Sequence, residues 1–142
     1  MTAKHKIIIT RNFKTKKEIK NGLMNIKYLK PNEGALFNMK TNRKHHFWMK
    51  NTLIPLDMIF MNKSNKVVGI VKNAKPYDES LYYINVASEK IIEIQSGYVG
   101  KNNIKIGDII ELIFKIRPKS STRNRKMNKK QNAGRYTRKN KY

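Results

Sequence analysis

The chain has 142 residues and carries 32 lysines and arginines against nine aspartates and glutamates, which gives a net charge of +23. That length suits one domain with a buried core, and that charge predicts a polyanionic partner such as DNA, RNA or an anionic membrane surface. Cysteine is absent, which excludes disulfides, thiolate catalysis and thiolate metal ligands. No apolar run approaches the ~18 residues of a membrane span, and the N-terminus lacks the features of a signal peptide. We therefore expect the protein inside a cell or a virion, next to the genome.

The chain begins with a predicted strand followed by a predicted short helix. The β-branched run KIIIT (6–10) is typical of a strand. The helix is predicted within 15–26, where Thr15 can act as the N-cap and Glu18, three residues later, completes a capping box. Because Gly22 lowers helix propensity, we expect this helix to be short.

Alternating apolar residues separated by turn residues predict that the rest of the folded part consists of short strands. One helical turn is also expected at 96–102, in SGYVGKN. The fold class is therefore mainly β, a β-rich α+β domain. We predict a small, mostly antiparallel barrel or rolled sheet of about seven or eight strands, with one short helix near the N-terminus. The further strands are expected at 35–39, 46–52, 56–62, 66–73, 81–88, 90–96 and 106–116.

The C-terminal segment 118–142 contains ten basic residues and no acidic residue. Its few apolar residues cannot offset an ordering entropy of roughly 1–2 kcal/mol per residue, so we predict a disordered basic tail. The folded domain is expected at 1–117, which keeps 22 basic and nine acidic residues and a net charge of +13. The predicted nucleic-acid contacts in the tail are Lys119, Arg123, Arg125, Lys126, Lys129, Lys130, Arg135, Arg138, Lys139 and Lys141.

The stretch FWMKNTLIPLD (47–57) sets a lysine and an aspartate among apolar residues. Alternation along a strand would put Trp48 and Lys50 on one face, and Lys50 could pair with Asp57 across a turn at Pro55. One interpretation is a structural ion pair or a hydrogen-bonded turn. The other is a small polar pocket that binds a ligand. The residues of this possible pocket are Trp48, Lys50, Asn51, Thr52 and Asp57.

Other catalytic and metal-binding patterns are weak. The adjacent His45 and His46 would face opposite sides of a strand, which disfavours a shared metal ion. No glycine-rich phosphate loop joins a strand to a helix, and no set of nucleophile, base and orienting acid can be assigned. We therefore predict no enzymatic activity, no metal and no cofactor.

Several motifs of the folded part resemble one known family. They are similar to the family catalogued as domain of unknown function number 192, and they extend over about residues 7 to 116. The resemblance implies a small β-barrel-like domain and no established activity. The family pattern has an arginine before GLM and a methionine in EGML, where this chain has Asn21 and Ala35. The motifs are GLM (22–24), EGALF (33–37), FWMKNTLIPLDMIF (47–60), VVGIVKNAKP (67–76), IIEIQSG (91–97) and IKIGD (104–108).

The charge favours a binding protein, with double-stranded DNA as the expected partner and with little sequence preference. Lysines would release counterions from the phosphates, and arginines could enter the minor groove. A basic domain with a basic tail could bridge duplexes and so condense or package a genome, in a nucleoid or a virion, with self-association possible. The alternatives are an RNA-associated or ribosome-associated protein, a small-ligand-binding or enzymatic domain that uses 48–57, and a virion structural protein that neutralises nucleic acid.

Overall fold

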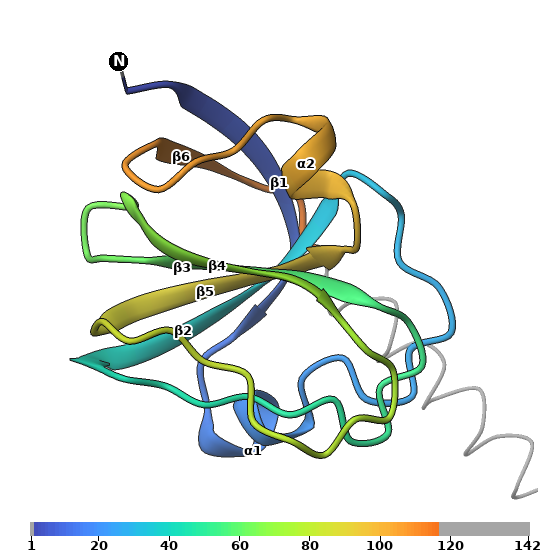
Figure 1. The fold of residues 1–142 in the computed structure, drawn as a ribbon. Helices are drawn as coiled ribbons and strands as arrows, with labels where there is room; N and C mark the ends of the chain where they lie inside the picture. The colour runs from blue at the N-terminus through green and yellow to red at the C-terminus, as the bar shows by residue number, and fades with distance from the viewer. Residues whose placement is uncertain (1, 117–142) are drawn as a thin grey trace, which may run out of the picture.

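The computed structural model describes residues 2–116, so the predicted tail at 118–142 and its ten predicted nucleic-acid contacts lie outside the described residues. The described part forms six strands and two short helices (Figure 1). Within these residues, no helix is long and apolar enough to cross a membrane. The elements are β1 (Lys4–Phe13), α1 (Lys16–Asn21), β2 (Glu33–Arg43), β3 (Leu56–Met61), β4 (Val67–Ala74), β5 (Ser88–Gln95), α2 (Tyr98–Lys101) and β6 (Ile109–Phe114).

The six strands make one mixed sheet in the order β4-β3-β5-β2-β1-β6. Strands β2 to β5 pair antiparallel, whereas β1 runs parallel to both β2 and β6. The sheet curls until its two edges meet at one end, where Lys66 pairs with Ile109 and the amide of Val67 donates to the carbonyl of Asp108 at 2.8 Å. The result is a partly closed barrel.

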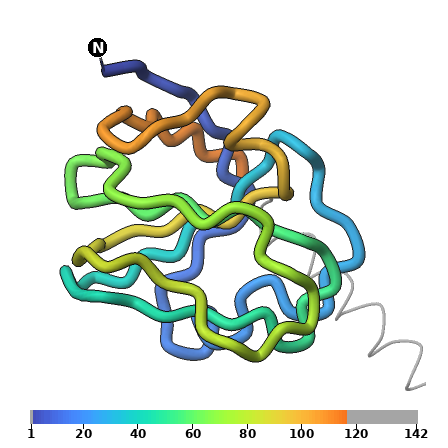
Figure 2. The backbone as a smooth tube through the Cα atoms, viewed as in Figure 1, coloured from blue at the N-terminus to red at the C-terminus, as the bar shows by residue number. Residues whose placement is uncertain are grey.

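Two apolar cores cover the two faces of the central strands. One core fills the inside of the curl, and the other lies between the sheet and a layer made of α1 and loops. The backbone of that layer runs below the sheet in Figure 2. All six residues of β3 are buried for this reason, although a sheet with one wet face would expose every second residue. The inner core includes Ile7, Ile9, Leu36, Ile59, Ile92, Ile94 and Ile110; the outer core includes Leu23, Leu29, Phe37, Phe47, Met58, Phe60 and Ile91.

The predicted start of the first helix is confirmed. The Thr15 hydroxyl accepts a hydrogen bond from the Glu18 amide at 3.1 Å, and the Glu18 carboxylate accepts one from the Thr15 amide at 3.0 Å. The helix ends at Gly22, whose φ of +46° is a conformation that glycine adopts without strain. The helical turn expected at 96–102 is also present, as α2.

The strands predicted at 46–52 and 81–88 are wrong. Residues 46–52 and 81–87 are loops, and within residues 2–116 they share one β-bridge, in which the Phe47 amide donates to the Tyr82 carbonyl at 2.9 Å and the Tyr82 amide donates to the Phe47 carbonyl at 2.7 Å. Buried and exposed side chains alternate along 46–49 because one side of the loop packs against the outer face of the sheet, as Phe47 and Met49 do. The β-rich, barrel-like fold class is confirmed, with six strands instead of seven or eight and with a mixed sheet.

Candidate functional site

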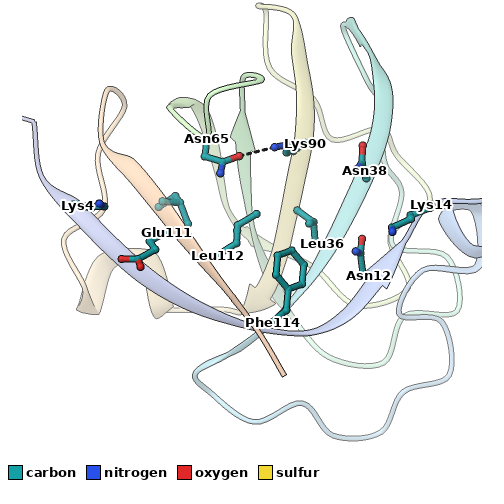
Figure 3. A pocket seen from close by; sticks show the side chains of 11 residues that line it. Lys4, Asn12, Lys14, Leu36, Asn38, Asn65, Lys90, Glu111, Leu112 and Phe114 are labelled. Carbon is teal, nitrogen blue, oxygen red and sulfur yellow. Dashed lines mark hydrogen bonds between the residues drawn. The ribbon is translucent and has the colours of Figure 1, made fainter. Parts of the chain in front are cut away.

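A groove on the concave side of the sheet collects cationic and amide side chains. We call it the basic groove, and its volume is about 640 Å³. Figure 3 shows Asn12, Lys14 and Asn38 at one end and Lys4 with Glu111 at the other. Its lining consists of Lys4, Lys14, Lys90, Asn12, Asn38, Asn65 and Glu111, over an apolar floor of Leu36, Ile110, Leu112 and Phe114.

An irregularity in β1 turns polar side chains into the groove. Ile7 and Ile9 belong to the inner core, and strict alternation would next point Arg11 inward. The register with β2 shifts between Ile9 and Arg11, so that Asn12 lies beside Leu36 instead. Phe13 then packs against the outer core. A bulge of this kind re-aims the side chains that follow it, and here it places an asparagine where the core would otherwise continue.

The ammonium group of Lys90 is held in place at the centre of the groove. Its Nζ donates to Asn65 Oδ1 at 2.8 Å (Figure 3). It also donates to the Lys63 carbonyl at 3.4 Å. Asn65 itself is fixed in the β3–β4 turn with a φ of +61°. Because an ammonium has three N–H donors, one remains for a ligand. The groove therefore offers a positioned cation flanked by amide donors.

The surface of the described part is more basic than its composition suggests. Eleven of the 32 basic residues lie at 117–142, which leaves 21 basic and nine acidic residues in the described part, a net charge of +12. Three of those acids are buried: Asp57, Glu93 and Asp108. The Asp108 carboxylate binds His5 Nε2 at 2.8 Å and two backbone amides, and the His5 hydrogen bond is the main reason that its pKa lies below the ordinary value.

The predicted pairing of Lys50 with Asp57 is wrong. Asp57 is 1% exposed, and its carboxylate accepts hydrogen bonds from the backbone amides of Asn73 at 2.9 Å, Gly97 at 3.1 Å and Val99 at 3.0 Å. Lys50 instead places its Nζ over the Trp48 ring, 5.1 Å from the ring centroid. The two side chains diverge because 46–52 is a loop rather than a strand paired with β3. Asp57 ties β3 to β4 and to α2.

Replacing Asp57 by alanine should destabilise the protein strongly. The backbone amides of Asn73, Gly97 and Val99 would lose their acceptor. The Val99 amide is buried, and an unsatisfied buried donor costs about 1–3 kcal/mol. We expect a loss of about 1–3 kcal/mol and a fall in Tm on the order of 10 °C. Thermal unfolding followed by circular dichroism measures this. Glu79→Ala, at an exposed acid, is the control and should stay within about 0.5 kcal/mol of the wild type. An unchanged Tm for Asp57→Ala would contradict the assignment.

Of the other residues of the pocket predicted at 48–57, two line a pocket next to α1 and one is exposed. Trp48 and Thr52 line a second, smaller pocket next to α1, together with Glu93 of β5. Asn51 is exposed, has a φ of +53°, and accepts a hydrogen bond from the Asn25 amide through its carbonyl. The structure thus brings two of the five residues to one pocket, and Asp57 is not among them. Glu93 was missed, although a glutamate inside the apolar run KIIEIQ was a visible signal.

His45 and His46 contact a backbone carbonyl and an aromatic ring, respectively. His45 is buried with its Nε2 at 2.9 Å from the Thr41 carbonyl, and the His46 ring lies 4.8 Å from that of Tyr83. Within residues 2–116, no group of three histidine, aspartate or glutamate side chains is placed to hold a metal ion.

Comparisons with known proteins place the folded part among uncharacterised relatives. The profile of the DUF192 family, described as Uncharacterized ACR, matches residues 2–112. A protein of unknown function from Novosphingobium aromaticivorans DSM 12444 has a similar crystal structure, with 35% identity, a TM-score of 0.66 and coverage of 69% of this chain and 70% of that chain. A Sinorhizobium meliloti 1021 protein named "putative transcription regulator" matches with 28% identity, a TM-score of 0.66 and coverage of 68% and 74%. No curated protein matches.

Proposed function

We propose that this chain, which belongs to the DUF192 family, is a non-enzymatic protein that binds nucleic acid, duplex DNA above all, with little sequence preference. The observation that carries the proposal is the charge of the described surface, where 21 basic residues face six acids outside the core. Such an excess attracts the phosphate backbone through counterion release, which supplies essentially all of non-specific binding.

The kind of donor in the basic groove also supports non-specific contact. Ammonium and amide groups commonly bind phosphate and sugar oxygens, which position a protein on nucleic acid without reading its sequence. The two helices of the described part have six and four residues, too short for a recognition helix in the major groove. Cationic groups on the domain and at 118–142 would let one molecule contact two duplexes, which favours condensation or packaging of a genome in a nucleoid or a virion.

Neutralising the groove lysines should weaken DNA binding more than neutralising other lysines. We compare the triple variant Lys4→Gln, Lys14→Gln, Lys90→Gln with a control triple that changes Lys27, Lys40 and Lys72, which lie outside the groove. Each lost phosphate contact lowers the slope of log K against log salt by about 0.9. We expect a loss of two to three such contacts, about 1.8–2.7 in slope, for the groove triple and less than about one contact for the control.

The measurement is a salt titration of the full-length protein with duplex DNA, duplex RNA and heparin in parallel. Equal slopes for the two triples would reject the basic groove as a contact surface. Failure of the wild type to bind duplex DNA at low salt would reject the proposed function, and tighter binding of RNA would assign the protein to RNA instead.

A further inference from the structure

The pocket between α1, β2, β5 and the 46–52 loop contains a buried carboxyl group with no partner. We call it the Glu93 pocket. Glu93 is 5% exposed and lies in β5 between Ala35 of β2 and Met58 of β3, both fully buried. Within residues 2–116, its side chain makes no hydrogen bond or ion pair, whereas Asp57 and Asp108 are each bound by three groups. A buried polar group without a partner is costly, so Glu93 points to a ligand that supplies one.

The walls of the Glu93 pocket are aromatic and apolar, and its mouth is cationic. Phe37 and Phe47 stand edge to face with centroids 5.4 Å apart, and Trp48 is 39% exposed beside them. Lys20 of α1 lines the pocket at an exposed position, and the Lys50 ammonium lies over the Trp48 ring. A ligand that fits this arrangement has a flat ring inside, a hydrogen-bonding edge toward Glu93, and negative charge outside.

The volume of the Glu93 pocket limits the size of the ligand ring that it can enclose. Its volume is about 240 Å³, below the roughly 300–1,000 Å³ of pockets that enclose drug-sized molecules. One ring with its substituents therefore fits better than a whole nucleotide, whose sugar and phosphate would stay at the mouth. The Thr52 hydroxyl, which donates to the Lys50 carbonyl at 3.2 Å, keeps its lone pairs as acceptors for the same ligand.

We propose that the Glu93 pocket binds one unstacked pyrimidine base of a single strand, with the base against Phe47 and Trp48 and its Watson–Crick edge on the Glu93 carboxyl. The inference rests on the proposed nucleic-acid binding and adds a second, base-dependent mode to it. Single strands are commonly held by bases stacked on aromatic side chains beside a basic surface.

The protonation state of Glu93 suits the Watson–Crick edge of a pyrimidine base. Burial raises the pKa of Glu93 to about 8, so its carboxyl is mostly neutral at pH 7 and offers one donor next to one acceptor. Thymine, uracil and cytosine each present an adjacent donor and acceptor on the Watson–Crick edge, which complements such a group. Among residues 2–116, the other charged or titratable side chains that line the pocket are Lys20 and His46.

The test compares two strands of equal charge on the full-length protein. One is a thymine hexadeoxynucleotide, and the other is an abasic hexamer with the same phosphates. Stacking of one base contributes about 1–3 kcal/mol, so we expect the thymine strand to bind at least about tenfold more tightly in fluorescence anisotropy. Equal affinities for the thymine and abasic strands, with duplex binding intact, would overturn the proposed base pocket but not the proposed function. Absence of binding to every strand and duplex would overturn the proposed function.

Two substitutions at Glu93 separate base recognition from a structural role. Glu93→Gln keeps an adjacent donor and acceptor, so its affinity for the thymine strand should stay within about threefold of the wild type at pH 6.5. Glu93→Leu removes both groups, and its affinity should fall to that of the abasic strand. A Tm for Glu93→Leu at or above the wild-type value would exclude unfolding as the cause. The proposal would be overturned if Glu93→Gln and Glu93→Leu lost affinity for the thymine strand equally, or if both kept it.

The pH dependence gives a further readout that packing alone would not produce. As pH rises through about 8, ionisation removes the donor of Glu93, and wild-type affinity for the thymine strand should fall relative to the abasic strand. Glu93→Gln should show no such fall. His46→Gln tests the other titratable side chain of the pocket: if the fall in affinity disappears in this variant, the pH dependence belongs to His46 and the role of Glu93 is contradicted. A wild-type profile identical to that of Glu93→Gln would contradict the role of the carboxyl.

Discussion

Replacing all ten basic residues of 118–142 by glutamine is expected to weaken duplex DNA binding by at least about a hundredfold near 0.1 M salt. The substitution lowers the net charge from +23 to +13 while leaving every residue of the described part unchanged. Each phosphate contact contributes about −0.9 to the slope of log K against log salt. If half of the ten residues contact phosphates, the slope becomes shallower by about four to five units, which a salt titration detects easily.

Two comparisons make this result specific to the basic segment. The thermal unfolding of the glutamine variant should match that of the wild type, because the changed residues follow the last residue of the described fold, Ile116. The variant with Lys4, Lys14 and Lys90 of the basic groove replaced by glutamine is the second comparison. It removes fewer charges, so its salt slope should change less. Equal salt slopes for the wild type and the tail variant would show that the described domain alone accounts for binding.

The elements that the sequence predicted correctly depend on local chemistry. The capping box of Thr15 and Glu18 lies within one helical turn, and Gly22 ends the helix beside it. The hairpin of β3 and β4 is likewise marked by turn residues between two apolar runs. Local signals of this kind survive in the fold because they do not depend on which distant segment packs against them.

The features that the sequence did not predict depend on distant partners. The amides that bind Asp57 include those of Gly97 and Val99, about forty residues away, so no local pattern could reveal them. Short apolar segments such as 46–52 and 81–88 are equally consistent with loops packed on a sheet. This ambiguity produced both the extra strands and the wrong Lys50–Asp57 pair. The basic groove depends on a bulge in β1 and on strands from both halves of the chain.

The pH dependence of stability should change clearly when Glu93 is replaced by glutamine. Burial raises the pKa of Glu93 from 4.5 to about 8 in the folded protein, and desolvation is the cause. Below about pH 4.5 the carboxyl is protonated in both the folded and the unfolded chain, so it imposes no penalty. As pH rises from there to about 8, folding must take up a proton, and the free energy of unfolding of the wild type falls. Above about pH 8 the folded protein carries the buried carboxylate, and the full penalty is present.

Glutamine removes this titration while keeping the size of the side chain. The free energy of unfolding of Glu93→Gln should therefore match that of the wild type near pH 4.5 and exceed it increasingly toward pH 8.5. One unit of pKa shift corresponds to about 1.4 kcal/mol, so the difference should reach a few kcal/mol. Urea unfolding at a series of pH values measures it, with Glu79→Gln at an exposed position as the control, whose difference from the wild type should not vary in this way. Parallel curves for Glu93→Gln and the wild type would mean that Glu93 is solvated or paired in solution. That result would also remove the physical basis for a neutral carboxyl at the floor of the Glu93 pocket.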